Sequence, residues 1–157
     1  MLRVFLHGLE SSNQGTKSVF FRERYPDMRI PNFSGPLKDR MEKLERDLEG
    51  EDELCIVGSS FGGLMATLFA LEHESRVERL ILLAPAVNLL REIPHGGTAL
   101  SVPVWIFHGR DDEVIPIDDV RTEAPRLFQN LQFHELDDDH SLHRRFSSLA
   151  WDTLLGA

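Results

Sequence analysis

The sequence predicts an α/β protein in which helices cover both faces of a mostly parallel sheet of about six strands. Short apolar runs alternate with helical patterns along the chain, an alternation typical of parallel strands joined by right-handed crossovers. The runs are apolar without interruption, as in strands that are buried on both faces. The expected strands are residues 2–6, 28–30, 54–57, 80–83, 104–107 and 131–134.

Helices are expected between these strands, at residues 16–24, 36–49, 61–73 and 117–124, with a last one at 141–154. The second is the clearest, because Pro36 suits the first position of a helix and Gly50 suits its end. Apolar residues recur through it at helical spacing, namely Leu37, Met41, Leu44 and Leu48.

Length and composition fit a single domain over residues 1–157, which can bury roughly 70% of the surface that the unfolded chain exposes. No apolar run approaches the ~20 residues of a membrane-spanning helix, and the first residues lead into a strand without a secretion signal, so we expect a cytoplasmic protein.

The single cysteine, Cys55, is expected to pack in the core. The net charge of −9 argues against nucleic acid as a partner. The oligomeric state stays open.

The most informative motif is the stretch from Gly58 to Gly62, which follows an apolar run and precedes a helical pattern. A serine held in a strained conformation at such a turn brings the residues two before and two after it too close for a β-carbon, which explains both glycines. Ser60 is therefore the candidate nucleophile, since Ser59 would require a glycine at Val57. The alternative is a glycine-rich turn that holds a phosphate.

A serine nucleophile needs a histidine base and a carboxylate that orients the histidine. The stretch 108–116 supplies Asp111 and Asp112 just after one predicted strand, and His140 follows the last one. Because the carboxyl ends of parallel strands meet at one edge of a sheet, these side chains are expected to lie near Ser60.

These motifs resemble those of the small cap-less bacterial serine esterases of the α/β-hydrolase superfamily. The resemblance rests on His7-Gly8 after the first strand, the turn at Ser60, the pattern His-Gly-x-x-Asp-x-x-Val/Ile-Pro that begins at His108, and the late histidine His140. It implies a compact α/β-hydrolase fold without a cap domain, with Ser60 as nucleophile, Asp112 as acid and His140 as base. Asp111 stays the alternative acid, because the choice rests on counting four residues from His108.

The resemblance also implies an oxyanion hole made by two backbone N–H groups, those of Leu9 and Phe61. His7 is expected to brace this loop through a hydrogen bond, and Glu10 is expected to face water. No cofactor is expected. A metal site at His140, His143 and residues 137–139 is the weaker alternative for this part of the chain.

The function predicted from these residues is hydrolysis of a carboxylic ester or thioester through an acyl-serine intermediate. The stretch 84–102 is too short for a lid and has room for one short helix at 87–90 and a turn at 94–97, so we expect an open groove that accepts short to medium acyl chains. An acyltransferase or peptidase with the same triad is an alternative. Another is a catalytically silent scaffold that binds a small molecule or a protein.

Overall fold

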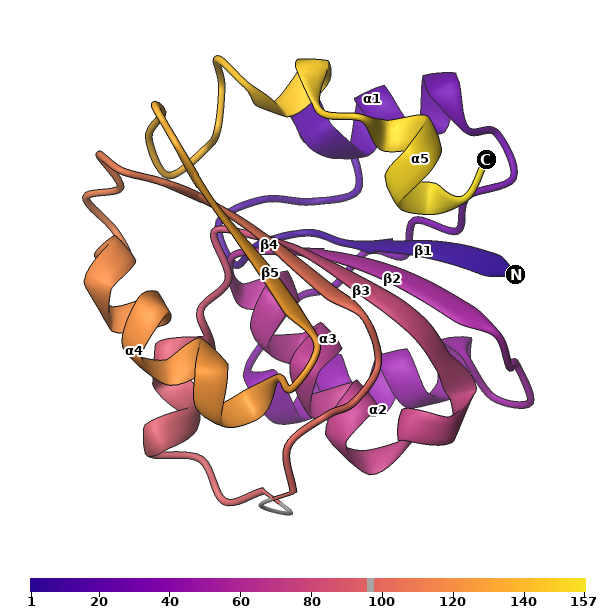
Figure 1. Ribbon diagram of the computed structural model, residues 1–157. Helices are drawn as coiled ribbons and strands as arrows, with labels where there is room; N and C mark the ends of the chain where they lie inside the picture. Colours follow the sequence, from indigo (N-terminus) through magenta and orange to yellow (C-terminus); the bar gives the residue numbers. More distant parts are fainter. Residues whose placement is uncertain (96–97) are drawn as a thin grey trace.

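A five-stranded parallel sheet forms the centre of the computed structural model, which describes residues 1–95 and 98–157 (Figure 1). The turn expected at 94–97 therefore lies partly outside the described residues. The strands stand side by side in chain order, and they are β1 (Leu2–Leu6), β2 (Leu54–Ser59), β3 (Val77–Leu83), β4 (Val104–Gly109) and β5 (Leu131–Leu136). The predicted α/β class and the parallel sheet are confirmed.

The expected strand at 28–30 is reduced to a single bridge. Arg29 pairs in parallel with Val4 at the outer edge of β1, and its N–H and carbonyl groups bond to the backbone of Arg3 and Phe5. Pro26 and Pro31 flank this segment, and since proline has no N–H to donate, the pairing cannot extend. The sheet therefore has five strands rather than six.

Helices lie on both faces of the sheet, as predicted (Figure 1). One face carries α1 (Thr16–Arg24) and α5 (Trp151–Leu155), and the other carries α2 (Leu37–Asp47), α3 (Phe61–Glu72) and α4 (Ile117–Leu127). The short 3-10 helices are η1 (Glu74–Arg76), η2 (Val87–Arg91) and η3 (Phe146–Ser148). In the described residues only η2 stands between β3 and β4, at the expected place of the short helix, and there is no cap domain.

The single long helix expected at 141–154 is wrong. A turn, η3 and the five residues of α5 take its place. Leu142 has a φ of 54°, which no right-handed helix accommodates. The Asp138 carboxylate accepts the N–H groups of Arg144 and Arg145, so a side chain replaces the carbonyls that a helix would offer them.

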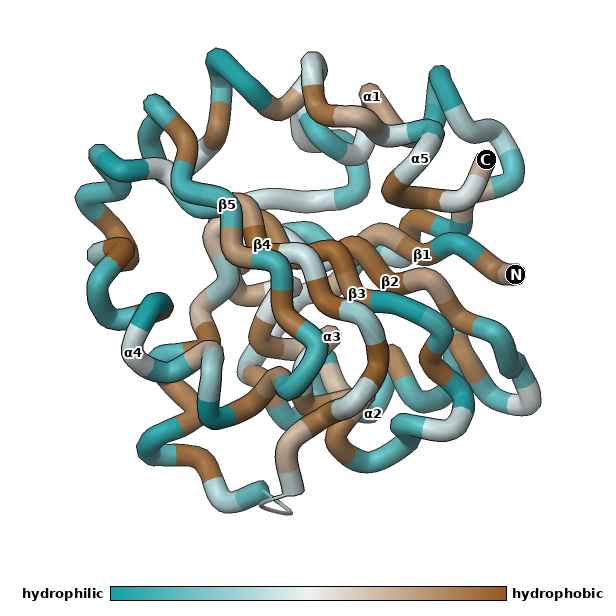
Figure 2. The backbone as a smooth tube through the Cα atoms, viewed as in Figure 1, coloured by the Kyte–Doolittle hydropathy of each residue, from teal (hydrophilic) through white to brown (hydrophobic). Residues whose placement is uncertain are grey.

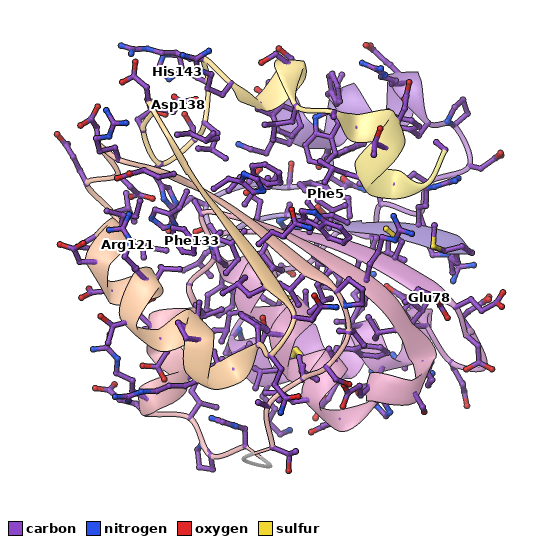
Figure 3. The ribbon with its side chains drawn as sticks, viewed as in Figure 1. Phe5, Glu78, Arg121, Phe133, Asp138 and His143 are labelled. Atoms are coloured by element: carbon purple, nitrogen blue, oxygen red, sulfur yellow. The ribbon has the colours of Figure 1, made fainter. Side chains whose placement is uncertain are left out.

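The two faces of the sheet are packed differently. Apolar residues follow the central strands (Figure 2), and on the side of α2, α3 and α4 they pack mostly against aliphatic side chains. On the side of α1 and α5 the core is aromatic: Phe21 lies edge-on to Trp151 at 4.8 Å between ring centroids and 4.9 Å from Phe5, which Figure 3 labels between the sheet and these helices. Cys55 is fully buried in this layer, as expected, and burial raises the pKa of its thiol to about 12.

The side on which the chain pairs with β1 changes after the bridge at Arg29, and this change positions the site. After β1 it forms α1, bridges to the outer edge of β1 at Arg29, and then returns through α2 to β2 on the other side of β1. In open parallel sheets the crevice for ligands lies at such a switch point, beyond the carboxyl ends of the strands. None of the helices in residues 1–95 and 98–157 has the length and apolar character needed to cross a membrane.

Candidate active site

Ser60 occupies the sharp turn between β2 and α3. Its φ of 56° and ψ of −114° lie in a region that residues with a side chain rarely adopt. The backbone fixes this conformation, since the Ser60 N–H donates to the carbonyl of Leu83 at 2.8 Å and the Ser60 carbonyl accepts the N–H of Ala86 at 3.0 Å. The strained turn thus rests on the neighbouring strand β3 and the loop that follows it.

Gly58 and Gly62, two residues before and after Ser60, occupy positions that have no room for a β-carbon. A β-carbon on Gly58 would collide with the carbonyl of Gly62, and one on Gly62 would collide with the carbonyl of Leu6 at the end of β1. These are the close approaches that the spacing of the glycines predicts. The collisions involve backbone atoms, which cannot rotate out of the way as a side chain can.

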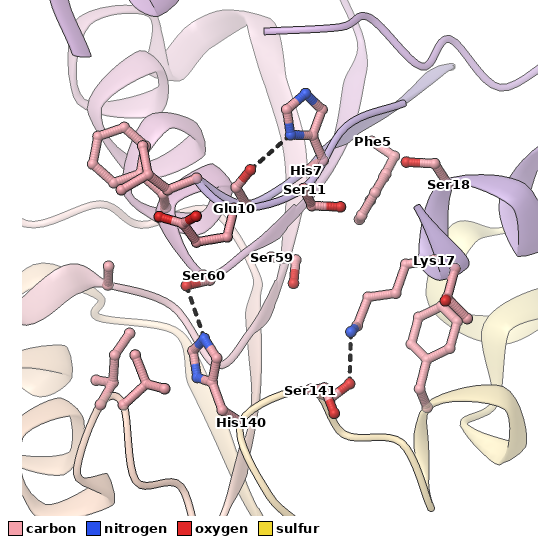
Figure 4. Close-up of a pocket in the computed structure, with 18 of the residues that line it drawn as sticks. Phe5, His7, Glu10, Ser11, Lys17, Ser18, Ser59, Ser60, His140 and Ser141 are labelled. Carbon is pink, nitrogen blue, oxygen red and sulfur yellow. Dashed lines mark hydrogen bonds between the residues drawn. The ribbon is translucent and has the colours of Figure 1, made fainter. Parts of the chain in front are cut away.

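The structure brings Ser60, His140 and Asp112 into one hydrogen-bonded chain. The Nε2 atom of His140 lies 3.1 Å from Ser60 Oγ, a contact that Figure 4 marks, and its Nδ1 atom lies 2.7 Å from Asp112 Oδ2. A carboxylate can only accept, so Nδ1 carries the proton and Nε2 is left to accept the serine hydroxyl. The three residues come from the ends of β2, β4 and β5.

Asp112 is a buried carboxylate with several donors. Its Oδ1 accepts the N–H groups of Val114 at 2.9 Å and Ile115 at 2.7 Å. Nε2 of His108 lies 3.1 Å from Oδ2 and 2.8 Å from the carbonyl of Ile115, so its proton faces both oxygens. Burial alone would raise the pKa of Asp112, but the hydrogen bonds from His108, His140 and the Ile115 N–H outweigh it and hold that pKa well below the usual range.

Asp111, the alternative acid, lies elsewhere. Its side chain is exposed, and its backbone N–H donates to the carbonyl of Asp138 at 3.0 Å. In the described residues Asp112 is the carboxylate that bonds to His140. His108 entered the sequence analysis as the start of a motif, and its contact with Asp112 was not predicted.

The loop that carries His140 is held by contacts within the loop and by contacts from distant parts of the chain. The buried carboxylate of Asp138 accepts the backbone N–H groups of Asp139 at 2.9 Å and Arg145 at 2.8 Å. A β-carbon on Gly109 would collide with the carbonyl of Asp138, so the glycine lets the end of β4 approach this loop. From α1, Lys17 Nζ donates to the carbonyl of Ser141 at 2.6 Å. Neither Asp138 nor Lys17 was expected in this role.

The loop after β1 lies against the turn at Ser60. A β-carbon on Gly8 would be 3.5 Å from the Cβ of Ser60. His7 is buried, its Nδ1–H donates to the Gly8 carbonyl at 2.7 Å and its Nε2 accepts the Phe33 N–H at 2.9 Å, which is the bracing expected from the sequence. Burial lowers the pKa of His7, the Gly8 carbonyl opposes this, and the nearby charges of Arg40 and Lys43 lower it further.

A cavity of about 850 Å³ opens over Ser60 and His140. Leu9 and Phe61 line it beside the serine, and Leu89 of η2 forms part of its wall. No acceptor for the backbone N–H of Leu9 or of Phe61 occurs within the described residues. Glu10 also lines the cavity and is exposed, in keeping with the expected contact with water.

Two groups of side chains in the described residues could each hold a metal ion. One is Asp138, Asp139 and His143, and the other is Glu45, Glu72 and His73. In the first group, which Figure 3 labels at Asp138 and His143, both oxygens of Asp138 already accept backbone N–H groups. The weaker alternative of a metal site included His140, but His140 does not belong to that group.

Many solved structures share this arrangement of strands and helices. The mouse α/β hydrolase domain-containing protein 10 superposes with a TM-score of 0.78 over 98% of this chain and 89% of its own, at 18% identity. The chain has the α/β-hydrolase fold. The same fold relates it to Est1E from Butyrivibrio proteoclasticus (TM-score 0.73, 16% identity, 99% of this chain and 86% of that one). Monoacylglycerol lipase from Paleococcus ferrophilus also matches (TM-score 0.74, 13% identity, 99% and 93%).

A family model adds a match in sequence to this α/β-hydrolase fold. Residues 26–100, just under half of the chain, match the model described as serine aminopeptidase, S33. The matched part includes the turn at Ser60 and ends before Asp112 and His140. A search of curated proteins finds no significant match.

Proposed function

We propose that the protein is a serine hydrolase that cleaves carboxylic esters or thioesters through an acyl-serine intermediate. The observation that carries the proposal is the chain of hydrogen bonds from Ser60 to His140 at 3.1 Å and from His140 to Asp112 at 2.7 Å. In this series of hydrogen bonds a neutral histidine accepts the serine proton, while a carboxylate keeps the histidine in the required tautomer.

In the proposed reaction Ser60 Oγ attacks the substrate carbonyl while His140 Nε2 takes its proton. His140 then gives that proton to the leaving oxygen or sulfur, and the acyl group stays on Ser60. The same histidine then takes a proton from water, which attacks the acyl carbonyl; the bond to Ser60 Oγ breaks, the acid leaves, and the histidine returns the proton to Oγ. Asp112 stays ionised throughout, since its low pKa favours the carboxylate that stabilises the positively charged histidine.

The negative charge that develops on the carbonyl oxygen requires preorganised donors. We propose that the backbone N–H groups of Leu9 and Phe61 supply them. Both residues line the cavity at Ser60, and both N–H groups lack an acceptor within the described residues. The contacts of His7 with Gly8 and Phe33 support this role, because they hold the loop that carries Leu9.

The cavity supports a small-molecule substrate with a short to medium acyl chain. Its volume of about 850 Å³ lies within the range of sites for small molecules, and in the described residues no cap domain encloses it. Peptide hydrolysis or acyl transfer would use the same three residues, and the aminopeptidase family model keeps the first of these open. A range of leaving groups on one acyl chain separates ester from peptide hydrolysis, and a range of acceptor nucleophiles separates hydrolysis from acyl transfer.

The test is hydrolysis of p-nitrophenyl butyrate by the wild type and by Ser60→Ala. The variant is expected to lose about 10⁴-fold or more in kcat, because the covalent route disappears. Ser59→Ala is the matched control, since it removes the neighbouring hydroxyl of the same cavity, and it is expected to lose less than about tenfold. A wild type without activity on esters, thioesters and peptides would favour the catalytically silent scaffold.

A further inference from the structure

Lys17 is a charged residue of the cavity that the proposed reaction does not use. It lies in the first turn of α1 and lines the cavity across from Ser60 (Figure 4). Its ammonium donates one hydrogen bond, to the carbonyl of Ser141. Within the described residues no carboxylate lies within 4.0 Å of it. An ammonium has three protons to donate, so two remain for another partner.

The two carboxylates whose charges act on Lys17 are occupied by other donors. Asp138 accepts three backbone N–H groups of its own loop, and Asp139 lies 2.6 Å from Nδ1 of His143 and accepts the Ser141 hydroxyl at 3.0 Å. They act on Lys17 only from a distance. Burial lowers the pKa of Lys17, and the charges of Asp139 and Asp138 oppose this without reversing it.

The surroundings of the ammonium are aromatic. Lys17 Nζ lies 5.4 Å from the centre of the Phe146 ring, and Phe5 and Phe20 also line the cavity. A partly buried charge without a counterion is unfavourable, and an apolar wall strengthens its attraction to any anion that enters. Holding the Ser141 carbonyl would need only a neutral donor, so that contact leaves the charge unexplained.

We propose that Lys17 binds a carboxylate of the substrate, so that the preferred substrates are esters or thioesters that also carry a free carboxylate, such as half esters of dicarboxylic acids. This inference rests on the proposed function for its substrate class. A carboxylate fits better than a phosphate, because a single lysine can balance one negative charge, and Asp138 and Asp139 nearby oppose a second one.

The test compares each carboxylate substrate with its neutral carboxamide. One series places the group on the acyl side, as p-nitrophenyl monoesters of glutarate to suberate, and the other places it on the leaving group, as 4-acetoxybenzoate against 4-acetoxybenzamide. In at least one series the wild type is expected to prefer the carboxylate by about 10- to 100-fold in kcat/KM, the range of a hydrogen bond to a charged group.

Variants of Lys17 separate charge from structure. Lys17→Gln can still donate to the Ser141 carbonyl but has no charge, and it is expected to lose the preference, as is Lys17→Met; Lys17→Arg should keep part of it. Lys38→Met is the matched control, because Lys38 is exposed on α2 and pairs with Glu42, and it should keep the full preference. A wild type without preference in both series, or a preference that survives Lys17→Gln, would overturn the inference.

A binding measurement makes this test independent of the reaction. Calorimetry with Ser60→Ala compares adipate with its neutral diamide, and adipate is expected to bind about 10-fold or more tightly, an advantage that Lys17→Gln in the same background removes. If the wild type cleaves neutral esters but adipate shows no advantage, the anion site is wrong and the hydrolase proposal stands. If no ester is cleaved but adipate binding depends on Lys17, the hydrolase proposal is wrong and the anion site stands.

Discussion

The turn at Ser60 and the loop that carries His140 reach the same cavity by different physical means. Between Gly58 and Gly62 a few consecutive residues determine the geometry, because the missing β-carbons let two backbone segments touch. The loop around His140 has no such local pattern and is held by Asp138 from within and by Lys17 from α1. A short glycine motif therefore marks the place of the proposed nucleophile, whereas the proposed base is placed by hydrogen bonds within its own loop and by a contact from α1.

After the loss expected for Ser60→Ala, the largest effect is expected from the proposed acid, Asp112. Asp112→Asn should lower kcat by about 10³- to 10⁴-fold, because an amide can donate to Nδ1 and so favours the wrong tautomer. Asp111→Asn, one residue away and exposed, should change kcat by less than about tenfold. Steady-state kinetics on p-nitrophenyl butyrate measure both, and a reversed ranking would move the acid to Asp111.

On the side of the turn, Gly62→Ala is expected to lower the free energy of unfolding by about 3 kcal/mol or more, since its β-carbon would collide with the Leu6 carbonyl. Gly50→Ala is the control: its φ is 76° and nothing lies within 4 Å of its added carbon, so the expected loss is about 1 to 2 kcal/mol. Urea unfolding compares them. Equal losses would show that the close approach at Gly62 contributes nothing specific.

On the side of the loop, Asp138→Asn is expected to cost about 2 kcal/mol of stability, because one acceptor oxygen becomes an NH₂ group that faces backbone N–H groups. We expect kcat/KM to fall by about 10- to 100-fold as His140 loses its position. Asp137→Asn removes an exposed carboxylate of the same loop and should change neither quantity appreciably. Unchanged kinetics in Asp138→Asn would mean that other contacts hold the loop.

The smallest effect concerns pH and His7. The folded-state pKa of His7 lies below its usual 6.5, since burial favours the neutral ring that accepts the Phe33 N–H. Its contribution to stability is therefore fully present above about pH 6.5 and is lost as the pH falls toward the lowered value. Urea unfolding between pH 8 and 5 should show a smaller decline in His7→Gln, which does not titrate. An equal decline in both proteins would rule out this role.

The difference between the two regions also explains what the sequence could predict. The strand, turn and helix around Ser60 follow from glycine spacing and apolar periodicity, which are local. The helix expected at 141–154 failed because Asp138, a residue outside that range, accepts the N–H groups of Arg144 and Arg145. The contact of Lys17 with Ser141 joins residues that are 124 positions apart, and no local pattern marks such a pair. His108 and Asp112 belong to one motif four residues apart, but their spacing alone does not show that the two side chains meet.

The most direct test of the central claim is the site at which a fluorophosphonate reacts with the protein, read by mass spectrometry of the intact chain and its peptides. We predict one adduct, on Ser60, that is absent in Ser60→Ala and forms at least about 100-fold more slowly in His140→Ala, because the serine has lost its base. An adduct on Ser59 or on another serine, or labelling of Ser60 at the same rate without His140, would contradict it.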